Sequence, residues 1–265
     1  QAIIQHHARI ANHKLDEKNI YLMSRYNDHY IAKDNFQNAI KITKKQLGGV
    51  ISKNILNGKR HILLPQILPP EIYKETVKKE FLKINGNGFL ISSSGINIKI
   101  NNLQKNIIIK QTKPNDWVLF RDADLTGWVI NFNGAERNVV SNEAQRFNSY
   151  GMTGCLNFYN SKFKDTSLIA EDGQCEDTIN IANSSGNISN MNVRNSFADA
   201  VDFDFSKLSV TNLNISNAGN DCLDVSGGSY KIGNASFVNC SDKGLSVGEV
   251  STLFGEKISV SQANI

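Results

Sequence analysis

The stretches ADAVDFDF, residues 198–205, and NDCLDV, residues 220–225, place one pattern of acidic and apolar residues twenty-two positions apart. Alternation of polar and apolar residues is typical of a β-strand with one buried face. When the flanking sequence is shifted by the same interval, further apolar residues align in columns. These columns are Ile179/Val201/Leu223/Leu245, Ile181/Phe203/Val225/Val247, Ile188/Val210/Ile232 and Val193/Ile215/Phe237. The sequence therefore contains a structural repeat with a period of about 22 residues.

A repeat of this length suits one coil of a parallel β-helix or a leucine-rich repeat. The leucine-rich pattern is missing, and each copy has short apolar alternations instead of a helix-length segment. We therefore predict an all-β fold, a right-handed parallel β-helix whose apolar columns run along the interior. A polar column of Asn195, Asn217 and Asn239 predicts an asparagine ladder at a bend between strands.

The first part of the chain has a different pattern. Residues 1–15, 33–49 and 69–84 have roughly helical apolar spacing. We therefore expect a mostly α-helical segment at residues 1–80 that covers one end of the stack of coils. Later runs rich in Ile and Val, separated by Asn and Gly, predict strands, so we expect the β-helix at residues 81–265.

Composition excludes several classes of protein. The net charge of the 265-residue chain is only +4, and Lys and Arg are dispersed, which argues against a nucleic-acid partner. No apolar run is long enough to predict a membrane span. The four cysteines either form disulfides, in one of three connectivities, or stay as buried thiols, and their spacing argues against a zinc site. They are Cys155, Cys175, Cys222 and Cys240.

Two further columns of the repeat carry carboxylates. The first column is Asp177, Asp199, Asp221 and Lys243; the second is Asn180, Asp202, Asp224 and Ser246, which we expect Asn157 and Asn131 to extend backwards. Neighbouring coils lie about 4.8 Å apart, so stacked carboxylates repel unless they are solvated, share a proton or hold a cation. The alternative is structural, because Asp near the start of a strand often accepts hydrogen bonds from turn backbone.

The segments ADAVDF, NDCLDVSGG and NCSDKGLSVGEV resemble the central motifs of polygalacturonase-type glycoside hydrolases, members of the pectate-lyase-like superfamily of parallel β-helices. Asp199 and Asp221 match motif carboxylates across a similarity that covers residues 197–250. The resemblance implies hydrolysis with inversion, by carboxylates about 6.5–9.5 Å apart. Asn220 replaces the general acid of the family, and Lys243 replaces its His. These departures argue against an intact polygalacturonase.

The wider superfamily includes lyases that bind acidic polysaccharides along the outside of one sheet. In its calcium-dependent members, acidic side chains hold Ca²⁺, and a Lys or Arg abstracts a proton from the sugar. This resemblance implies that Lys243 is the base or, as we favour, a counter-ion to Asp221. It also implies oxygen ligands for Ca²⁺. The candidate ligands are Asp199, Asp202, Asp221 and Asp224.

Taken together, we expect a secreted, periplasmic or cell-surface β-helix that binds or processes a polysaccharide by lyase or hydrolase chemistry. Candidate catalytic residues are Asp199, Asp221 and Lys243, and candidate substrate-binding residues are Asn180, Asp202, Asp224 and Ser246. The alternative is a non-catalytic β-helix: an adhesin, a surface scaffold or a module of a larger chain. All five histidines precede residue 81, which excludes a catalytic His on the predicted sheet.

Two other groups of residues are weaker candidates for contact with a ligand. Trp117 and Trp128 either stack on a sugar ring or pack in the core. The polar segment 142–154 is expected to wall a groove, with Arg137, Arg146 and Tyr150 reaching an anionic ligand from that region.

Overall fold

The structure is a computed structural model. It describes residues 21–26, 29–33, 52–56, 59–65, 77–81, 88–135, 148, 150–248 and 250–264. The chain divides into two compact units, Gln1–Glu75 with Phe147–Met152 and Thr76–Arg146 with Thr153–Ile265. The described strands of the first unit form an antiparallel sheet in the order β1-β2-β4-β3. Their bounds are β1 (Tyr21–Tyr26), β2 (His29–Lys33), β3 (Ser52–Leu56) and β4 (Lys59–Pro65).

The described residues contain strands and no helix. The helices expected at 1–15 and 33–49 lie outside the described residues, apart from the last residue of β2. The helix expected at 69–84 is not formed at β5 (Val77–Phe81), which is a strand paired with the next one. Pairing along a sheet supplies backbone hydrogen bonds that override weak helical spacing. Coverage of one end of the stack by the N-terminal segment stays a prediction.

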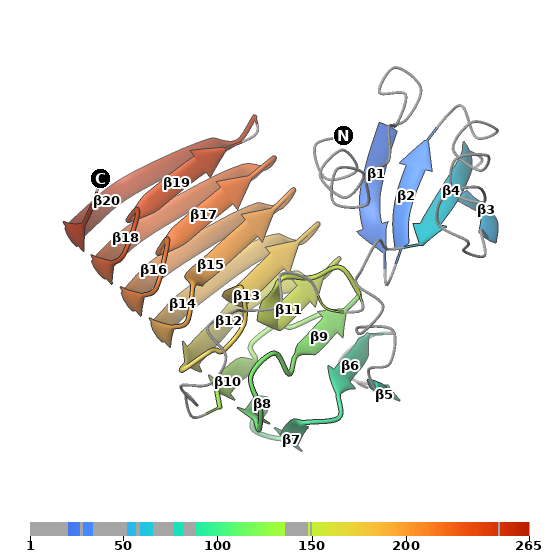
Figure 1. Cartoon of the computed structure of the whole chain (residues 1–265), viewed down its shortest axis with the longest axis horizontal. Coiled ribbons are helices and arrows are strands. Elements are labelled where there is room, and N and C mark those ends of the chain that lie inside the picture. Colours follow the sequence, from blue (N-terminus) through green and yellow to red (C-terminus); the bar gives the residue numbers. More distant parts are fainter. Residues whose placement is uncertain are drawn as a thin grey trace. The chain divides into compact units, whose positions relative to one another are not determined.

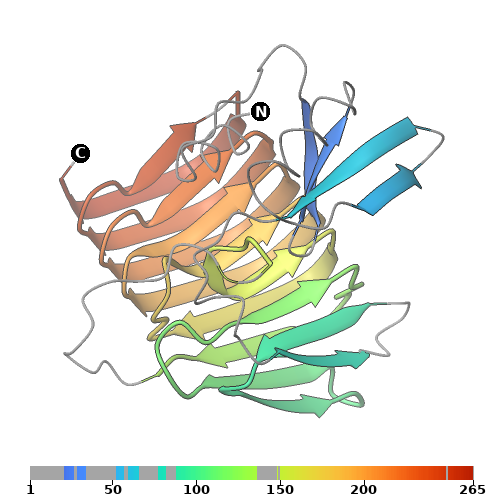
Figure 2. The same ribbon diagram turned by 45° about the vertical axis from the view of Figure 1, so that its right-hand side comes forward.

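The second unit consists of two eight-stranded sheets, shown in Figure 1 and in a turned view in Figure 2. The long-strand sheet contains β7 (Ile96–Asn101), β8 (Asn106–Gln111), β10 (Val129–Asn133), β12 (Lys162–Glu171), β14 (Ser185–Ser196), β16 (Lys207–Ala218), β18 (Ser229–Cys240) and β20 (Thr252–Ala263). The short-strand sheet contains β5, β6 (Phe89–Ser93), β9 (Val118–Arg121), β11 (Gly154–Tyr159), β13 (Asp177–Ala182), β15 (Asp199–Asp204), β17 (Leu223–Ser226) and β19 (Leu245–Gly248). Strands β5, β6 and β7 pair antiparallel with their neighbours.

From β8 and β9 onward every pairing is parallel, and consecutive strands alternate between the sheets. The result is a parallel β-helix of about six coils, as the repeat predicted. Its core is formed by the predicted columns, except that Val247 of the last coil is exposed. Ile179 pairs with Val201 and Val201 with Leu223, and all three are fully buried between the sheets. Continuous apolar columns explain the stacking, because one coil alone cannot bury its inner face.

The predicted asparagine ladder is present at the bend that ends the long strands. Asn217 Nδ2 donates to Asn195 Oδ1, and Asn239 Nδ2 donates to Asn217 Oδ1, both at 2.9 Å. The three residues have φ between 57° and 58°, in the left-handed region that Asn tolerates better than most residues. The column therefore combines a required backbone conformation with side chains that hydrogen-bond to their own copies.

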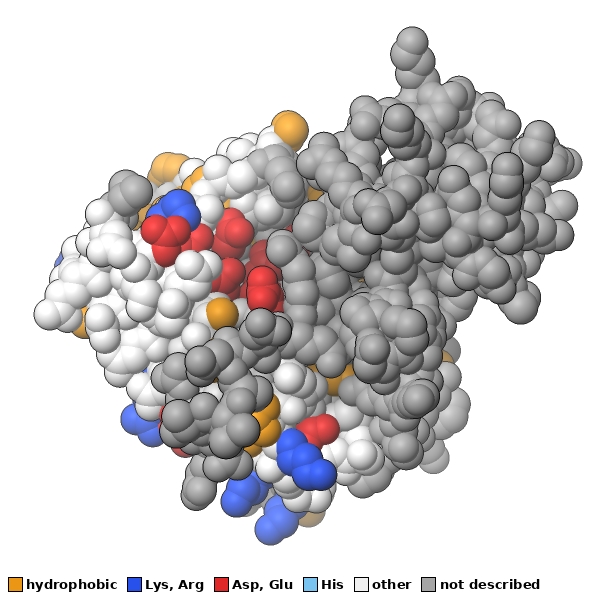
Figure 3. All heavy atoms as spheres, viewed as in Figure 1, with side chains coloured by type: hydrophobic (Ala, Val, Ile, Leu, Met, Phe, Trp, Pro, Cys, Tyr) orange, Lys and Arg blue, Asp and Glu red, His pale blue; other side chains and the backbone are white. Residues whose placement is uncertain are grey.

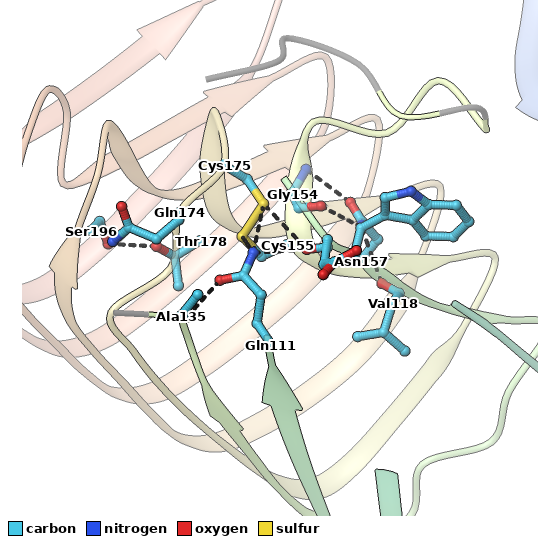
Figure 4. The surroundings of a disulfide bond; sticks show 12 residues. Gln111, Val118, Ala135, Gly154, Cys155, Asn157, Gln174, Cys175, Thr178 and Ser196 are labelled. Carbon is cyan, nitrogen blue, oxygen red and sulfur yellow. Dashed lines mark hydrogen bonds between the residues drawn. A yellow bond between two sulfur atoms is a disulfide. The ribbon is translucent and has the colours of Figure 1, made fainter. Parts of the chain in front are cut away.

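All four cysteines are paired, as Cys155–Cys175 and Cys222–Cys240. The first disulfide lies beside Gln111, whose buried side chain donates through Nε2 to the backbone oxygen of Asp116 at 2.8 Å. The same nitrogen lies 3.2 Å and 3.5 Å from the two sulfur atoms, as Figure 4 shows. Each disulfide closes a loop shorter than one coil, which restricts the unfolded chain.

Candidate functional site

A strip of buried and half-buried carboxylates follows the short-strand sheet from coil to coil. The register places Asn180 of β13 beside Asp202 of β15, Asp202 beside Asp224 of β17, and Asp224 beside Ser246 of β19. This row is the second predicted column, and Figure 3 shows acidic side chains gathered over these strands. The acidic strip consists of Asp177, Asp199, Asp202, Asp204, Asp221 and Asp224.

Two members of the strip each accept a backbone hydrogen bond from the next coil. Asp199 Oδ1 accepts from the backbone nitrogen of Asp221 at 2.8 Å and from Nδ2 of Asn220 at 2.6 Å. Asp221 Oδ1 accepts from the backbone nitrogen of Lys243 at 2.8 Å. These carboxylates therefore join consecutive coils, which is the structural role that sequence analysis gave as the alternative for this column.

Lys243 is held between two carboxylates. Its Nζ lies 3.4 Å from both side-chain oxygens of Asp221 and also donates to Asp242. The hydrogen bond to Asp242, followed by the charge of Asp221, raises the pKa of Lys243. A lysine that acts as a catalytic base has to be uncharged at its working pH. The geometry therefore supports the counter-ion role of Lys243 over the role of base.

One buried amide holds two other carboxylates of the strip. Asn180 has no exposed surface, and its Nδ2 donates to Oδ2 of Asp202 at 3.1 Å and to Oδ2 of Asp204 at 3.2 Å. Both carboxylates belong to β15 and their oxygens converge on the same nitrogen. An amide that donates to two carboxylates offsets part of their mutual repulsion.

The carboxyl of Asp199 is protonated more readily than an ordinary aspartate. Burial raises the pKa of Asp199 to about 6, and the charges of Asp221 and Asp224 act in the same direction. The hydrogen bonds from Asp221 and Asn220 oppose this change without cancelling it. A carboxyl with this pKa is protonated in part of its population in weakly acidic solution.

Two further pKa values in the strip are raised. Burial raises the pKa of Asp224, while a hydrogen bond with Ser246 acts against the change. Asp177 is almost fully buried, and burial together with the charge of Asp199 raises its pKa well above the usual range. The strip thus contains three carboxyls with raised pKa values on consecutive coils, and shifted pKa values of this kind also occur where side chains act as general acids or bases.

The four carboxylates expected as calcium ligands all belong to this strip. Within the described residues, no group of three or more His, Cys, Asp or Glu side chains meets in an arrangement that could hold a metal ion. One of the four, Asp221, already has Lys243 as its cation. Calcium binding by the strip stays a prediction.

The structure places other sequence candidates away from the strip. Trp117 and Trp128 are buried, so they pack in the core. Asn131 lies on β10 of the long-strand sheet, and the residue that precedes Asn157 in the row is Leu119 of β9. The prediction that Asn131 extends the second column was wrong, because the spacing between copies of the repeat changes before β11. Arg137 and Arg146 lie outside the described residues.

Sequence analysis missed Tyr230, which lies beneath the strip. Its hydroxyl group lies 3.0 Å from the backbone oxygen of Phe203 and accepts from the backbone nitrogen of Ser206 at 3.2 Å. Burial, followed by the charge of Asp204, raises the pKa of Tyr230. A Cβ at Gly228 would lie 2.4 Å from this hydroxyl, so the glycine leaves room for it.

The repeat contained a signal for Tyr230. In earlier coils, Ser184 and Ser206 each accept a backbone hydrogen bond through the side-chain oxygen, at 3.0 Å. Gly228 occupies the next position of this serine column, and the hydroxyl of Tyr230 takes over the acceptor role. A glycine that interrupts a column of serines thus marks where a larger side chain enters.

In the part of the chain that the structure describes, no helix has the length and apolar character needed to span a membrane. Comparison of the chain with models of protein families, with curated proteins and with solved structures found no match. The fold and the geometry of the acidic strip are therefore the basis for a functional proposal.

Proposed function

We propose that the outer face of the short-strand sheet binds a polysaccharide, and that Asp199 and Asp224 hydrolyse its glycosidic bonds. The observation that carries this proposal is the placement of the two carboxyls on adjacent paired strands, Asp199 on β15 and Asp224 on β17, where burial raises the pKa of Asp199 to about 6. Burial makes Asp199 the carboxyl that is protonated in weakly acidic solution, and the charges of Asp221 and Asp224 act in the same direction. Neither is fully buried, so both are accessible from the outer face.

Glycoside hydrolysis uses one carboxyl as a proton donor and a second carboxylate as base or nucleophile. Asp199 is the donor in this proposal and Asp224 is its ionised partner. Polygalacturonase-type motifs, which residues 197–250 resemble, carry their catalytic carboxylates on adjacent coils of the same sheet. Asn220 replaces the general acid of that family, so the acid role passes to the protonated carboxyl that Asn220 contacts.

The charge of the strip favours an uncharged polysaccharide. Among the described residues that hydrogen-bond to Asp199 and Asp221, only Lys243 carries a positive charge. The remaining carboxylates repel a uronic-acid polymer unless a cation lies between them. Ca²⁺ held by Asp199, Asp202, Asp221 and Asp224 would supply that cation, as the lyase resemblance implies, and would make binding of an acidic polymer calcium-dependent.

The second candidate function is a non-catalytic β-helix, an adhesin or a surface scaffold. It is favoured by the backbone hydrogen bonds that Asp199 and Asp221 accept, since these explain both residues without any chemistry. Under either function we propose a secreted, periplasmic or cell-surface location, because two disulfides are typical of proteins that fold in an oxidising compartment.

Depolymerisation assays on the wild type and on Asp199→Asn and Asp224→Asn test the proposal. Neutral and uronic-acid polymers are incubated with and without Ca²⁺ across weakly acidic to neutral pH, and new reducing ends are measured. We expect activity that declines above pH about 6 and a loss of about 100-fold in Asp199→Asn. Asp165→Asn, an exposed aspartate on β12, is the matched control.

Each outcome of these assays separates the candidates. Reducing ends without unsaturated sugars support hydrolysis, whereas unsaturated products with ultraviolet absorbance indicate a lyase. Binding without either product supports the non-catalytic β-helix. If no polymer binds in either the presence or the absence of Ca²⁺, a polysaccharide is not the ligand of this face.

A further inference from the structure

A second surface feature lies on the long-strand sheet, opposite to the acidic strip in the coil. A trough of about 800 Å³ crosses the outer face of β8, β10, β12, β14, β16 and β18. Because it crosses the strands, it runs along the stack from coil to coil. Six strands about 4.8 Å apart give it a length of roughly 24 Å.

The trough follows two rows of the sheet. The register aligns the first row across all six strands, and its members are Ile108, Asn131, Ile169, Asn192, Asn214 and Ser236. The second row includes Asn133, Glu171, Arg194, Ser216 and Val238. The side chains of both rows point away from the core, since they alternate along each strand with fully buried residues.

The lining of the trough mixes polar and apolar groups and has no net charge. Its two charged residues, Glu171 and Arg194, pair with each other on adjacent coils, with Nε of Arg194 2.6 Å from Oε2 of Glu171. The other polar groups are amides and hydroxyls. This surface therefore does not discriminate in favour of a charged ligand of either sign.

The amides of the trough are already oriented. Asn214 Nδ2 donates to Asn192 Oδ1 at 2.9 Å, and Asn131 Nδ2 donates to Asn106 Oδ1 at 3.0 Å. Each such amide has a second N–H and further acceptor capacity for a ligand. Because the coil-to-coil hydrogen bonds fix the side chains before a ligand arrives, binding costs little side-chain entropy.

Exposed apolar side chains lie between these polar groups. Ile108 is 43% exposed, Ile169 is 39% exposed and Val238 is 37% exposed, although each belongs to a coil with a well-formed core. Apolar surface next to fixed amides and hydroxyls suits a ligand that has both hydroxyl groups and apolar CH surfaces along its length.

We propose that this trough is a second binding site, which takes an extended, uncharged glycan chain that runs along the stack of coils. A sugar chain offers hydroxyls to the amide and serine groups and CH faces to the isoleucine and valine side chains. An extended peptide is not the matching ligand, because β-strand addition needs an open sheet edge and the trough crosses the middle of the sheet.

The site is separate from the acidic strip and does not depend on the proposed hydrolysis. None of the strip carboxylates lines the trough. Substitutions in one site therefore leave the other intact, so failure of one proposal can be distinguished from failure of the other.

The experiment is calorimetric titration with linear neutral hexasaccharides of β-1,4-linked glucose and of β-1,4-linked mannose. Ser216→Phe fills the second row of the trough, and Ser209→Phe makes the same change on the same strand outside it. Asn214→Ala removes one of the amides without adding bulk. Asp199→Asn tests independence from the strip, and circular dichroism confirms that each variant is folded.

We expect the wild type to bind one of the two hexasaccharides, and Ser216→Phe to weaken binding at least tenfold. Asn214→Ala weakens it less and Ser209→Phe leaves it unchanged, while Asp199→Asn leaves unchanged the part of the binding that Ser216→Phe removes. Three outcomes would overturn the proposal: neither neutral chain binds, an oligogalacturonate of equal length binds as tightly, or Ser216→Phe has no effect. Self-association of the wild type that Ser216→Phe abolishes would identify the trough as a protein interface and also contradict it.

Discussion

The asparagine ladder and the acidic strip repeat with the same period on the same coils. They differ in how identical side chains on neighbouring coils interact with one another. In the ladder, Asn217 donates to Asn195 and accepts from Asn239, so each amide hydrogen-bonds to copies of itself. In the strip, Asp202 and Asp224 are also stacked, yet carboxylates cannot donate to each other unless one is protonated. The ladder is self-sufficient, whereas the strip depends on other donors, on protons or on cations.

This difference separates structure from function in a repeat. A column kept only for structure is expected to use a side chain that can pair with its own copy, as Asn does. Burial, together with the charges of Asp221 and Asp224, raises the pKa of Asp199, and this costs stability at neutral pH. Under the proposed function the strip serves chemistry and the ladder serves structure, and substitutions in the two columns should therefore differ in their effects.

The largest effect is expected where a disulfide links the two columns. Cys222 follows Asp221 of the strip, and Cys240 follows Asn239 of the ladder. Replacing both cysteines by Ser removes a crosslink across 18 residues, which we expect to lower the free energy of unfolding by about 3 kcal/mol. Denaturant unfolding measures it, and a loss below about 1 kcal/mol would show that the link contributes little.

The next effect is a gain in stability from Asp199→Asn. The folded-state pKa of Asp199, about 6, exceeds its usual value of 3.8, so the folded state binds the proton more tightly. The free energy of unfolding therefore falls as pH rises between these two values. The variant lacks this loss, because the Asn amide has no proton to release. Allowing for partial exposure, we expect the variant to be more stable by about 2 kcal/mol at pH about 8.

Unfolding experiments at several pH values check this gain. The difference between wild type and Asp199→Asn should shrink toward pH about 3, below both pKa values, because there the wild-type carboxyl is mostly protonated in both states. Asp165→Asn is the control and should show no comparable pattern. A variant that is less stable than the wild type at every pH would mean that the backbone hydrogen bonds to Asp199 dominate.

A smaller loss is expected from Asn217→Ala in the middle of the ladder. The change removes two exposed side-chain hydrogen bonds and places Ala at a φ of 58°. We expect the free energy of unfolding to fall by about 1.5 kcal/mol. Asn217→Gly keeps the backbone relaxed and should cost less. Equal losses in the two variants would assign the whole effect to the hydrogen bonds.

The smallest effect is expected from Lys243→Met. The exposed ammonium balances Asp221 and Asp242, so its removal should lower stability in neutral solution and have less effect where carboxylates are protonated. Hydrolysis should persist, because Lys243 is a counter-ion in this account. Complete loss of depolymerisation in a folded Lys243→Met, with activity retained by Lys243→Arg, would instead indicate that the cation takes part in the reaction.

The regular coils could be predicted from the sequence because the period is fixed. With a fixed period, equivalent residues in each copy of the repeat point to the same side of the sheet. Once Ile179, Val201 and Leu223 are assigned to the core, alternation places Asp202 and Asp224 outside. The prediction failed for Asn131, where the interval between copies is irregular. It also failed at β5, whose strand pairing depends on a neighbouring strand and not on its own apolar spacing.

The contacts of the strip were less accessible to sequence analysis. The bridge from Asn180 to Asp202 and Asp204 depends on side-chain conformations that alternation does not specify. The burial that raises the pKa of Asp177 depends likewise on packing around the strip. The partner of each cysteine depends on where the strands end, because the strand ends decide which cysteines lie close together. The pairing of Cys222 with Cys240 could therefore not be chosen from spacing alone.

The most direct test of the central claim is the titration of the Asp199 carboxyl carbon by NMR, assigned by comparison with Asp199→Asn. We predict that the Asp199 signal titrates with a midpoint at pH about 6. Ionisation of Asp224 should add a second, smaller change to the same signal. A single midpoint for Asp199 at or below 3.8 would contradict the account. It would show that the aspartate column, like the asparagine ladder, is stabilised by its hydrogen bonds alone.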